Sequence, residues 1–249
     1  MNERFSRMEL LLGEGAADRL SQKKVAVFGI GGVGGYAVEG LARCGIGHFL
    51  LVDHDTVARS NINRQIIATE NSLGRLKVEV MAERIASINP QATIERRACF
   101  YLPENRAQFD LRDYDYIIDA VDTVTAKLSI IELAKLCDVP VISSMGVGNK
   151  LRPELLTVAD IEKTSVCPLA KVMRRELKKR RIRKVKVLFS AEQPVRAPQV
   201  RETAVKVAEA SCRRSLPGSI SFVPSVAGLM IAGEVVKDLM AEGSLQVLS

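Results

Sequence analysis

Short apolar runs alternate along this chain with segments in which apolar residues recur at helical spacing. Apolar, β-branched runs predict buried strands, and apolar residues three or four positions apart predict helices that bury one face. Strands are predicted at 24–28, 48–52, 92–98, 116–121 and 140–144. Helices are predicted between them at 33–44, 77–89 and 124–137. This alternation is typical of an α/β domain with a largely parallel sheet.

The pattern changes beyond Gly148. Residues 155–158 predict an antiparallel edge strand, and 222–240 predict a strongly apolar helix. We therefore expect a Rossmann-like, doubly wound, mostly parallel sheet with helices on both faces and a C-terminal antiparallel extension. A length of 249 residues without a linker-like stretch predicts a single domain over 1–249.

Membrane and export signals are weak in this sequence. No basic, apolar signal peptide is recognised at the start, and the apolar stretch 222–236 is shorter than the about 20 residues that a spanning helix needs. We expect a core or dimer-interface helix there, and no stable membrane association. Five cysteines at wide spacing favour a reduced, cytoplasmic chain.

A glycine-rich loop, Gly29-Ile30-Gly31-Gly32-Val33-Gly34, joins the first predicted strand to the first predicted helix. In that context Gly29, Gly31 and Gly34 permit a tight turn and close backbone approach, and the amides of the helix N-terminus attract phosphate. Asp53 ends the second predicted strand, where a carboxylate accepts hydrogen bonds from ribose hydroxyls. The sequence thus predicts a nucleotide site rather than a simple tight turn.

Three charged residues bear on which nucleotide is bound. Arg64 and Lys77 suit charge stabilisation on a transferring phosphoryl group, which a nicotinamide cofactor does not need; the alternative is two solvated surface charges. Asp122 follows strand 116–121, at whose carboxyl end open sheets bind ligands. One carboxylate together with phosphates and waters suffices for Mg²⁺. Asp119, inside that strand, is the less favoured candidate because it could be a structural carboxylate.

A longer ordered motif comprises Asp53-x-Asp55-x-Val57-x-x-Ser60-Asn61-x-Asn63-Arg64-Gln65, Gly74-x-x-Lys77 and Asp119-Ala120-Val121-Asp122. It resembles the ubiquitin-activating-enzyme superfamily, whose bacterial members in molybdopterin and thiamine biosynthesis attach AMP to a carboxylate. The resemblance implies ATP and Mg²⁺ as cofactors. It gives Asp53 the ribose, Arg64 and Lys77 the phosphates, and Asp122 the metal. It also places Asp55, Asn61 and Asn63 at the nucleotide. Thr123 departs from the usual asparagine.

The same resemblance bears on assembly. Residues 1–22 resemble the helical N-terminal arm of the superfamily, with a helix to about Leu20, and Arg7 would complete the site of a partner subunit in a homodimer. No Cys-x-x-Cys pair is present, which disfavours a structural zinc site. Cys167, before Pro168 at a helix start, and Cys212 are candidate acyl carriers. We favour ordinary apolar packing for both.

A basic segment accounts for the net charge. Residues 171–186 hold ten of the 36 Lys and Arg and one of the 29 Asp and Glu, so the segment is +9 and the rest of the chain is −2. We expect a basic helix with Val172, Met173 and Leu177 toward the core and its cations on a nucleic-acid backbone. The alternative is a solubilising surface. The candidate nucleic-acid-binding residues are Lys171, Arg174, Arg175, Lys178, Lys179 and Arg181.

A closer resemblance rests on Lys163-Thr164-Ser165-x-x-Pro168-Leu169-Ala170, Phe189-Ser190-x-Glu192 and Gly218-Ser219-Ile220-x-Phe222-Val223-Pro224. These segments resemble the bacterial tRNA threonylcarbamoyladenosine dehydratases, and 163–190 then reads as a basic insertion. Such enzymes use ATP to activate and cyclise a threonylcarbamoyl group on adenosine 37 of tRNA. The resemblance implies tRNA as the partner and leaves a sulfur-transfer protein open. The alternative is an adenylyltransferase for the C-terminal glycine of a ubiquitin-like sulfur carrier.

Overall fold

The computed structural model describes residues 3–195 and 217–241, and its centre is one seven-stranded sheet. The strands follow the order β3-β2-β1-β4-β5-β7-β6, with β6 antiparallel to β7 and the other pairs parallel. Their bounds are β1 Lys24–Phe28, β2 His48–Val52, β3 Thr93–Arg97, β4 Tyr116–Asp119, β5 Val141–Ser144, β6 Leu156–Asp160 and β7 Lys186–Ser190. The predicted mostly parallel sheet with an antiparallel extension is confirmed.

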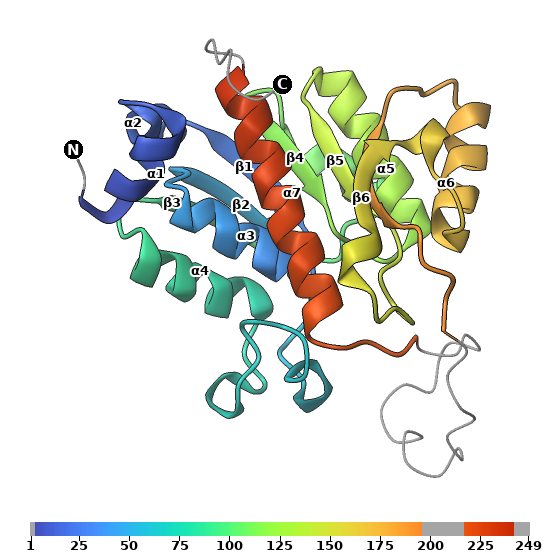
Figure 1. The fold of residues 1–249 in the computed structure, drawn as a ribbon, viewed down its shortest axis with the longest axis horizontal. Helices are drawn as coiled ribbons and strands as arrows, with labels where there is room; N and C mark the ends of the chain where they lie inside the picture. The colour runs from blue at the N-terminus through green and yellow to red at the C-terminus, as the bar shows by residue number, and fades with distance from the viewer. Residues whose placement is uncertain (1–2, 196–216, 242–249) are drawn as a thin grey trace.

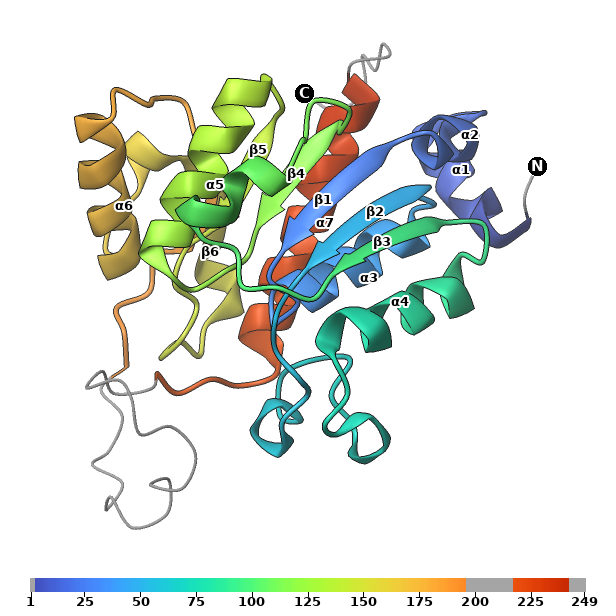
Figure 2. The same cartoon turned by 180° about the vertical axis from the view of Figure 1, so that it is seen from behind.

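Helices cover both faces of this sheet (Figures 1 and 2). One face carries α3 (Gly34–Arg43), α4 (Lys77–Ile88) and α7 (Phe222–Ala241), and the other carries α5 (Val124–Cys137) and α6 (Pro168–Lys179). Short 3-10 helices occur in the connections, at Glu3–Phe5 (η1), Arg59–Asn61 (η2), Glu70–Ser72 (η3), Pro103–Gln108 (η4), Pro153–Leu155 (η5) and Ile161–Lys163 (η6).

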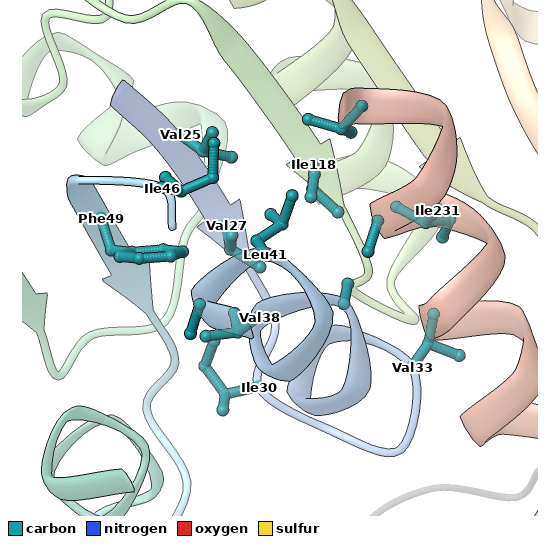
Figure 3. Packing of buried hydrophobic residues seen from close by; sticks show 14 of the residues in the cluster. Val25, Val27, Ile30, Val33, Val38, Leu41, Ile46, Phe49, Ile118 and Ile231 are labelled. Carbon is teal, nitrogen blue, oxygen red and sulfur yellow. The ribbon is translucent and has the colours of Figure 1, made fainter. Parts of the chain in front are cut away.

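Alternating residues of β1 enter two separate cores. Val25 and Val27 pack with α3 and α7, as Figure 3 shows, whereas Ala26 and Phe28 pack with α5 on the opposite face. All four side chains are fully buried. A strand covered on both faces is continuously apolar, which is why 24–28 reads as an unbroken run.

The apolar C-terminal helix is a core helix. α7 lies along α3, and the two helices approach so closely that a Cβ at Gly228 would lie 2.4 Å from the carbonyl oxygen of Val33. A Cβ at Gly40 would similarly lie 2.7 Å from Cβ of Ala232. No helix in the described part of the chain is long and apolar enough to cross a membrane.

Three local predictions were wrong. The expected single helix to about Leu20 is divided into α1 (Ser6–Leu12) and α2 (Ala16–Ser21), because Gly13 and Gly15 adopt positive φ angles of 90° and 74°. The basic helix ends at Lys179, and residues 186–190 form a strand within the sheet. Val172 is 38% exposed, so of the three residues of α6 that were expected to face the core, only Met173 and Leu177 are buried.

Candidate nucleotide site and basic surface

The glycine loop turns sharply between β1 and α3. Gly29 has a φ of +90°, and a Cβ there would lie 2.7 Å from the carbonyl oxygen of Ala120. A Cβ at Gly34 would lie 1.8 Å from the carbonyl oxygen of Gly29, so no larger residue fits either position. At Gly31 the nearest atom is the Gln65 amide nitrogen at 3.9 Å, which leaves room above the loop. The turn therefore presents bare backbone at the N-terminus of α3, as phosphate binding requires.

Asp53 holds the glycine loop from the end of β2. One carboxylate oxygen accepts a hydrogen bond from the amide of Ile30 at 2.6 Å, and the other accepts from the amide of Asp55 at 2.9 Å. Asp53 thus lies beside the loop at the carboxyl edge of the sheet, where a ribose would lie in a Rossmann-like fold.

Lys77 stands at the first position of α4 and pairs with Asp55. Its Nζ lies 2.7 Å from a carboxylate oxygen of Asp55, and the Lys77 side chain is 6% exposed while that of Asp55 is 48% exposed. The backbone sets this geometry, because the amide of Lys77 donates to the carbonyl of Asp55 at 3.0 Å and Thr56 pairs with Leu76. The Lys77 ammonium group is therefore almost shielded from solvent, and the Asp55 carboxylate that it contacts is half-exposed.

Arg64 reaches over the glycine loop. Its Cγ would lie 3.6 Å from a Cβ at Gly32, and its guanidinium donates to the carbonyl of Ser60 at 2.9 Å and to Oδ1 of Asn63 at 3.1 Å. Its position beside the bare loop suits a phosphate.

The two motif asparagines organise the loops around the site. Asn61 accepts a hydrogen bond from the amide of Ala58 at 3.1 Å and closes its own turn. Asn63 donates to the carbonyl of Ser219 at 3.0 Å and joins the motif to the segment before α7. In this structure Oδ1 of Asn61 and both polar atoms of Asn63 therefore have partners within the protein.

The two candidate aspartates after β4 differ sharply in burial. Asp119 is fully buried, where it pairs with Lys127 and accepts from Ser143. Asp122 is exposed, and its hydrogen bond within the described residues comes from the Thr123 hydroxyl at 3.3 Å. Asp122 is thus the carboxylate available for a cation, and Asp119 has a structural role.

Sequence reasoning missed two buried polar residues in this region. Lys127 is fully buried under the loop that bears Asp122, and its signal was a lone cation on the apolar stripe of α5. Gln65 is 7% exposed and lies beside Gly31, and its Oε1 is a buried acceptor without a partner in the described structure. Such an acceptor calls for a donor from outside the protein chain.

Possible metal ligands were compared within residues 3–195 and 217–241. Asp53, His54 and Asp55 place one ligand atom each within 4.8 Å of one another. However, Asp53 accepts two backbone amides and Asp55 pairs with Lys77, so Asp122 better fits a cation that prefers oxygen ligands. Cys167 is buried, with Sγ 4.0 Å from the carbonyl of Gly146, and Cys212 lies outside the described residues.

Arg7 lies far from the glycine loop of its own chain. It is exposed on α1 and makes no hydrogen bond or ion pair with described residues. Two positions earlier, the ring of Phe5 lies 3.4 Å from where a Cβ of Gly45 would stand, just before β2 begins. The arm therefore sits at the amino edge of the sheet, whereas the glycine loop is at the carboxyl edge.

The cations of α6 do not all face solvent freely. Arg174 donates to the carbonyl and hydroxyl of Thr164, both at 2.6 Å. Arg175 and Lys179 pair with Glu176, and hydrogen bonds from Lys179 and then Arg180 lower the pKa of that carboxyl group to about 2. Among the described residues, no partner contacts the side chains of the remaining candidates, namely Lys171, Lys178 and Arg181.

The chain is similar to known proteins over nearly its whole length. The model of the ThiF family matches residues 5–248. A tRNA threonylcarbamoyladenosine dehydratase of Bacillus subtilis is 43% identical over 97% of this chain and 96% of its own length. Crystal structures of the E. coli tRNA N6-threonylcarbamoyladenosine dehydratase match with a TM-score of 0.85. Its AMP complex is 34% identical, with 97% of this chain and 95% of that one covered; its ATP complex is 33% identical, with 98% and 96% covered.

These matches extend over nearly the whole chain and include the glycine loop, the segment 53–77 and the basic helix. The fold agrees with the sequence-based resemblance. The chain therefore belongs to the ThiF family, among relatives that include the tRNA threonylcarbamoyladenosine dehydratases.

Proposed function

We propose that this chain is an ATP-dependent tRNA-modifying enzyme, which adenylates the carboxylate of threonylcarbamoyladenosine at position 37 of tRNA and cyclises it with loss of water. The observation that carries the proposal is the bare glycine loop with Asp53, Arg64 and Lys77 grouped around it. The near full-length similarity to dehydratases, one of which binds ATP, supports the same substrate.

The first step is attack of the substrate carboxylate on the α-phosphorus of ATP, with pyrophosphate leaving. Negative charge accumulates on the transferring group, and fixed cations stabilise it. Lys77 is held in place by its backbone hydrogen bond and its ion pair with Asp55, and Arg64 is held by Ser60 and Asn63. Both cations are thus positioned before the nucleotide binds, which limits the reorganisation that accompanies reaction.

Asp122 would hold Mg²⁺, since its carboxylate is exposed beside the loop and lightly hydrogen-bonded. The ion supplies charge neutralisation for the phosphates. Asp53 would accept hydrogen bonds from the ribose hydroxyls. Gln65 Oε1, which lacks a hydrogen-bond partner among the described residues, is available to a donor at the glycine loop.

The second step closes the ring. A nitrogen of the same modification attacks the acyl carbon, loses its proton and displaces AMP. Because the nucleophile belongs to the substrate, no cysteine of the enzyme is required. Burial of Cys167 agrees with this route. We also propose a cytoplasmic homodimer in which Arg7 of one subunit completes the site of its partner.

The decisive experiment combines purified protein, ATP, magnesium and tRNA that carries threonylcarbamoyladenosine. Mass analysis of the digested nucleosides should show loss of one water, with AMP and pyrophosphate formed in equal amounts. Lys77→Met should abolish the product, whereas Arg112→Gln, on an exposed loop, should not. If the protein instead adenylates a ubiquitin-like carrier protein and leaves the nucleoside unchanged, the alternative function is correct.

A further inference from the structure

A groove lies between the C-terminal half of α6 and η6. It has a volume of about 760 Å³, and its floor contains Leu177 and Ile182. Glu162 is the carboxylate among its described lining residues. Four cations also line it, namely Arg174, Lys178, Arg181 and Arg183. An apolar floor beneath several cations of one sign concentrates positive potential in the groove.

Within the described residues, the side chains of three of these four cations have no hydrogen-bonding or ionic partner. Arg174 is occupied by Thr164 and so fastens η6 to α6. The other three are Lys178, Arg181 and Arg183. The neighbouring Arg180, outside the groove, pairs with Glu132 and Glu176. Cations occur along the whole of segment 171–186, but several of those whose side chains are unpaired among the described residues line the groove.

The groove is remote from the nucleotide loop. α6 begins beside Gly146, after the carboxyl end of β5, and its chain continues into β7 at that strand's amino end. The helix thus runs from the carboxyl edge of the sheet to the amino edge, as Figure 2 shows. At 1.5 Å per residue its 12 residues span about 18 Å. A single ligand that reached both places would have to be long and anionic.

We propose that this groove anchors the phosphate backbone of the RNA substrate, away from the nucleotide loop, through Lys178, Arg181 and Arg183. The inference rests on the proposed function and adds a second contact region to it. Phosphate contacts position a nucleic acid without reading its bases. The groove therefore contributes to substrate binding equally in the ground state and the transition state, which changes KM rather than kcat.

Arg181 offers a substitution that removes charge without disturbing the fold. It follows the end of α6 with a φ of 58°, and the amides of Arg181 and Ile182 donate to the carbonyls of Lys178 and Leu177. This pattern of helix ending normally has glycine at the left-handed position. Arg181→Gly should therefore leave the thermal midpoint unchanged or raised while it deletes one groove cation.

The test measures binding of unfractionated bacterial tRNA by fluorescence anisotropy at salt concentrations from about 50 to 200 mM. Each lost phosphate contact lowers the slope of log affinity against log salt by about 0.7 to 0.9. The triple variant Lys178→Gln, Arg181→Gly, Arg183→Gln should therefore lose about 2 to 3 from the slope. KM for modified tRNA should rise in the same variant, with kcat and ATP affinity unchanged.

A matched control neutralises three exposed cations elsewhere, Arg43, Arg96 and Arg112, each to Gln. An unchanged slope in the groove variant, or an equal loss in the control, overturns the groove proposal while wild-type cyclisation stands. Absence of cyclisation by the wild type instead refutes the proposed function. If an acidic carrier protein binds in the groove and tRNA does not compete with it, the assignment of the groove to RNA is overturned.

Discussion

Lys127 and Asp119 form an ion pair of 2.9 Å in which both side chains are fully buried. Lys127 also donates to the carbonyl of Val121 at 3.0 Å, while Asp119 accepts from the amide of the same residue at 3.2 Å. The pair thereby holds both polar groups of the residue that precedes Asp122. The position of the proposed magnesium ligand depends on a charge pair inside the protein.

Lys127→Met should destabilise the protein strongly, because it leaves the Asp119 carboxylate buried without a counter-charge. Loss of one partner of a buried pair costs about 3 to 5 kcal/mol. Urea unfolding measures this change in the free energy of unfolding. The double variant Lys127→Met, Asp119→Asn should recover part of the loss, since the charge is gone. A cost for Lys127→Met as small as that of a surface pair would contradict the structural reading.

Lys77→Met and Asp122→Asn should each reduce turnover by roughly 100-fold or more, since each removes charge stabilisation at the transferring phosphate. Stability should change little for Asp122→Asn, whose side chain is exposed. Steady-state kinetics with thermal unfolding as the companion measurement separates the two effects. Parallel loss of folding and activity would make either residue structural. Glu104→Gln, on the 3-10 helix η4, serves as a charge-matched control.

Much of the fold follows directly from apolar periodicity. β1, β2 and α5 have the same bounds as predicted, because buried parallel strands and a fully packed helix leave uninterrupted apolar patterns. The break in the N-terminal arm was missed because glycines at positive φ do not interrupt a hydrophobic pattern. The end of α6 was missed for a related reason, since Arg181 takes the left-handed conformation usually left to glycine.

The candidate site was predictable as a set of residues but not as a set of contacts. Sequence motifs identified Asp53, Arg64 and Lys77, which the fold does place around one loop. They could not separate side chains that face a ligand from those that hold the loop, as Asn61 and Asn63 do. That distinction depends on hydrogen bonds between segments far apart in sequence, such as Asn63 to Ser219.

Mixed dimers test the role of Arg7. If this side chain acts in the partner's site, Arg7→Ala and Asp122→Ala chains should each be inactive alone, yet regain activity when they are unfolded, mixed and refolded together. One of the two sites in a heterodimer then has both groups intact. Activity in the mixture, measured as AMP release, should approach a quarter of the wild-type value per site if chains pair at random, a rough estimate from two-fold symmetry. Full activity of Arg7→Ala alone would contradict the model.

Glu176→Gln should tighten tRNA binding, because it releases Lys179 and Arg180 from their carboxylate partner. Since the pKa of Glu176 is lowered to about 2, the carboxylate is charged and paired at neutral and mildly acidic pH. The ion pairs of Glu176 are present above its ordinary pKa and are lost only as pH falls through its lowered pKa. The effect of the substitution should therefore be the same at neutral and mildly acidic pH. Anisotropy titrations of tRNA at two pH values measure the change in affinity. Glu162→Gln, in the groove, should also tighten tRNA binding.

The packing of α7 along α3 has a consequence for biosynthesis. The segment around Val33 is covered by Gly228, and Pro224 lies 3.2 Å from where a Cβ of Gly32 would stand, so the glycine loop is completed by residues that are synthesised long after it. During translation, the earlier strands can pair before α7 has been made. A nascent chain that still lacks α7 would expose the apolar flank of α3, which makes it a candidate for chaperone binding until α7 packs there.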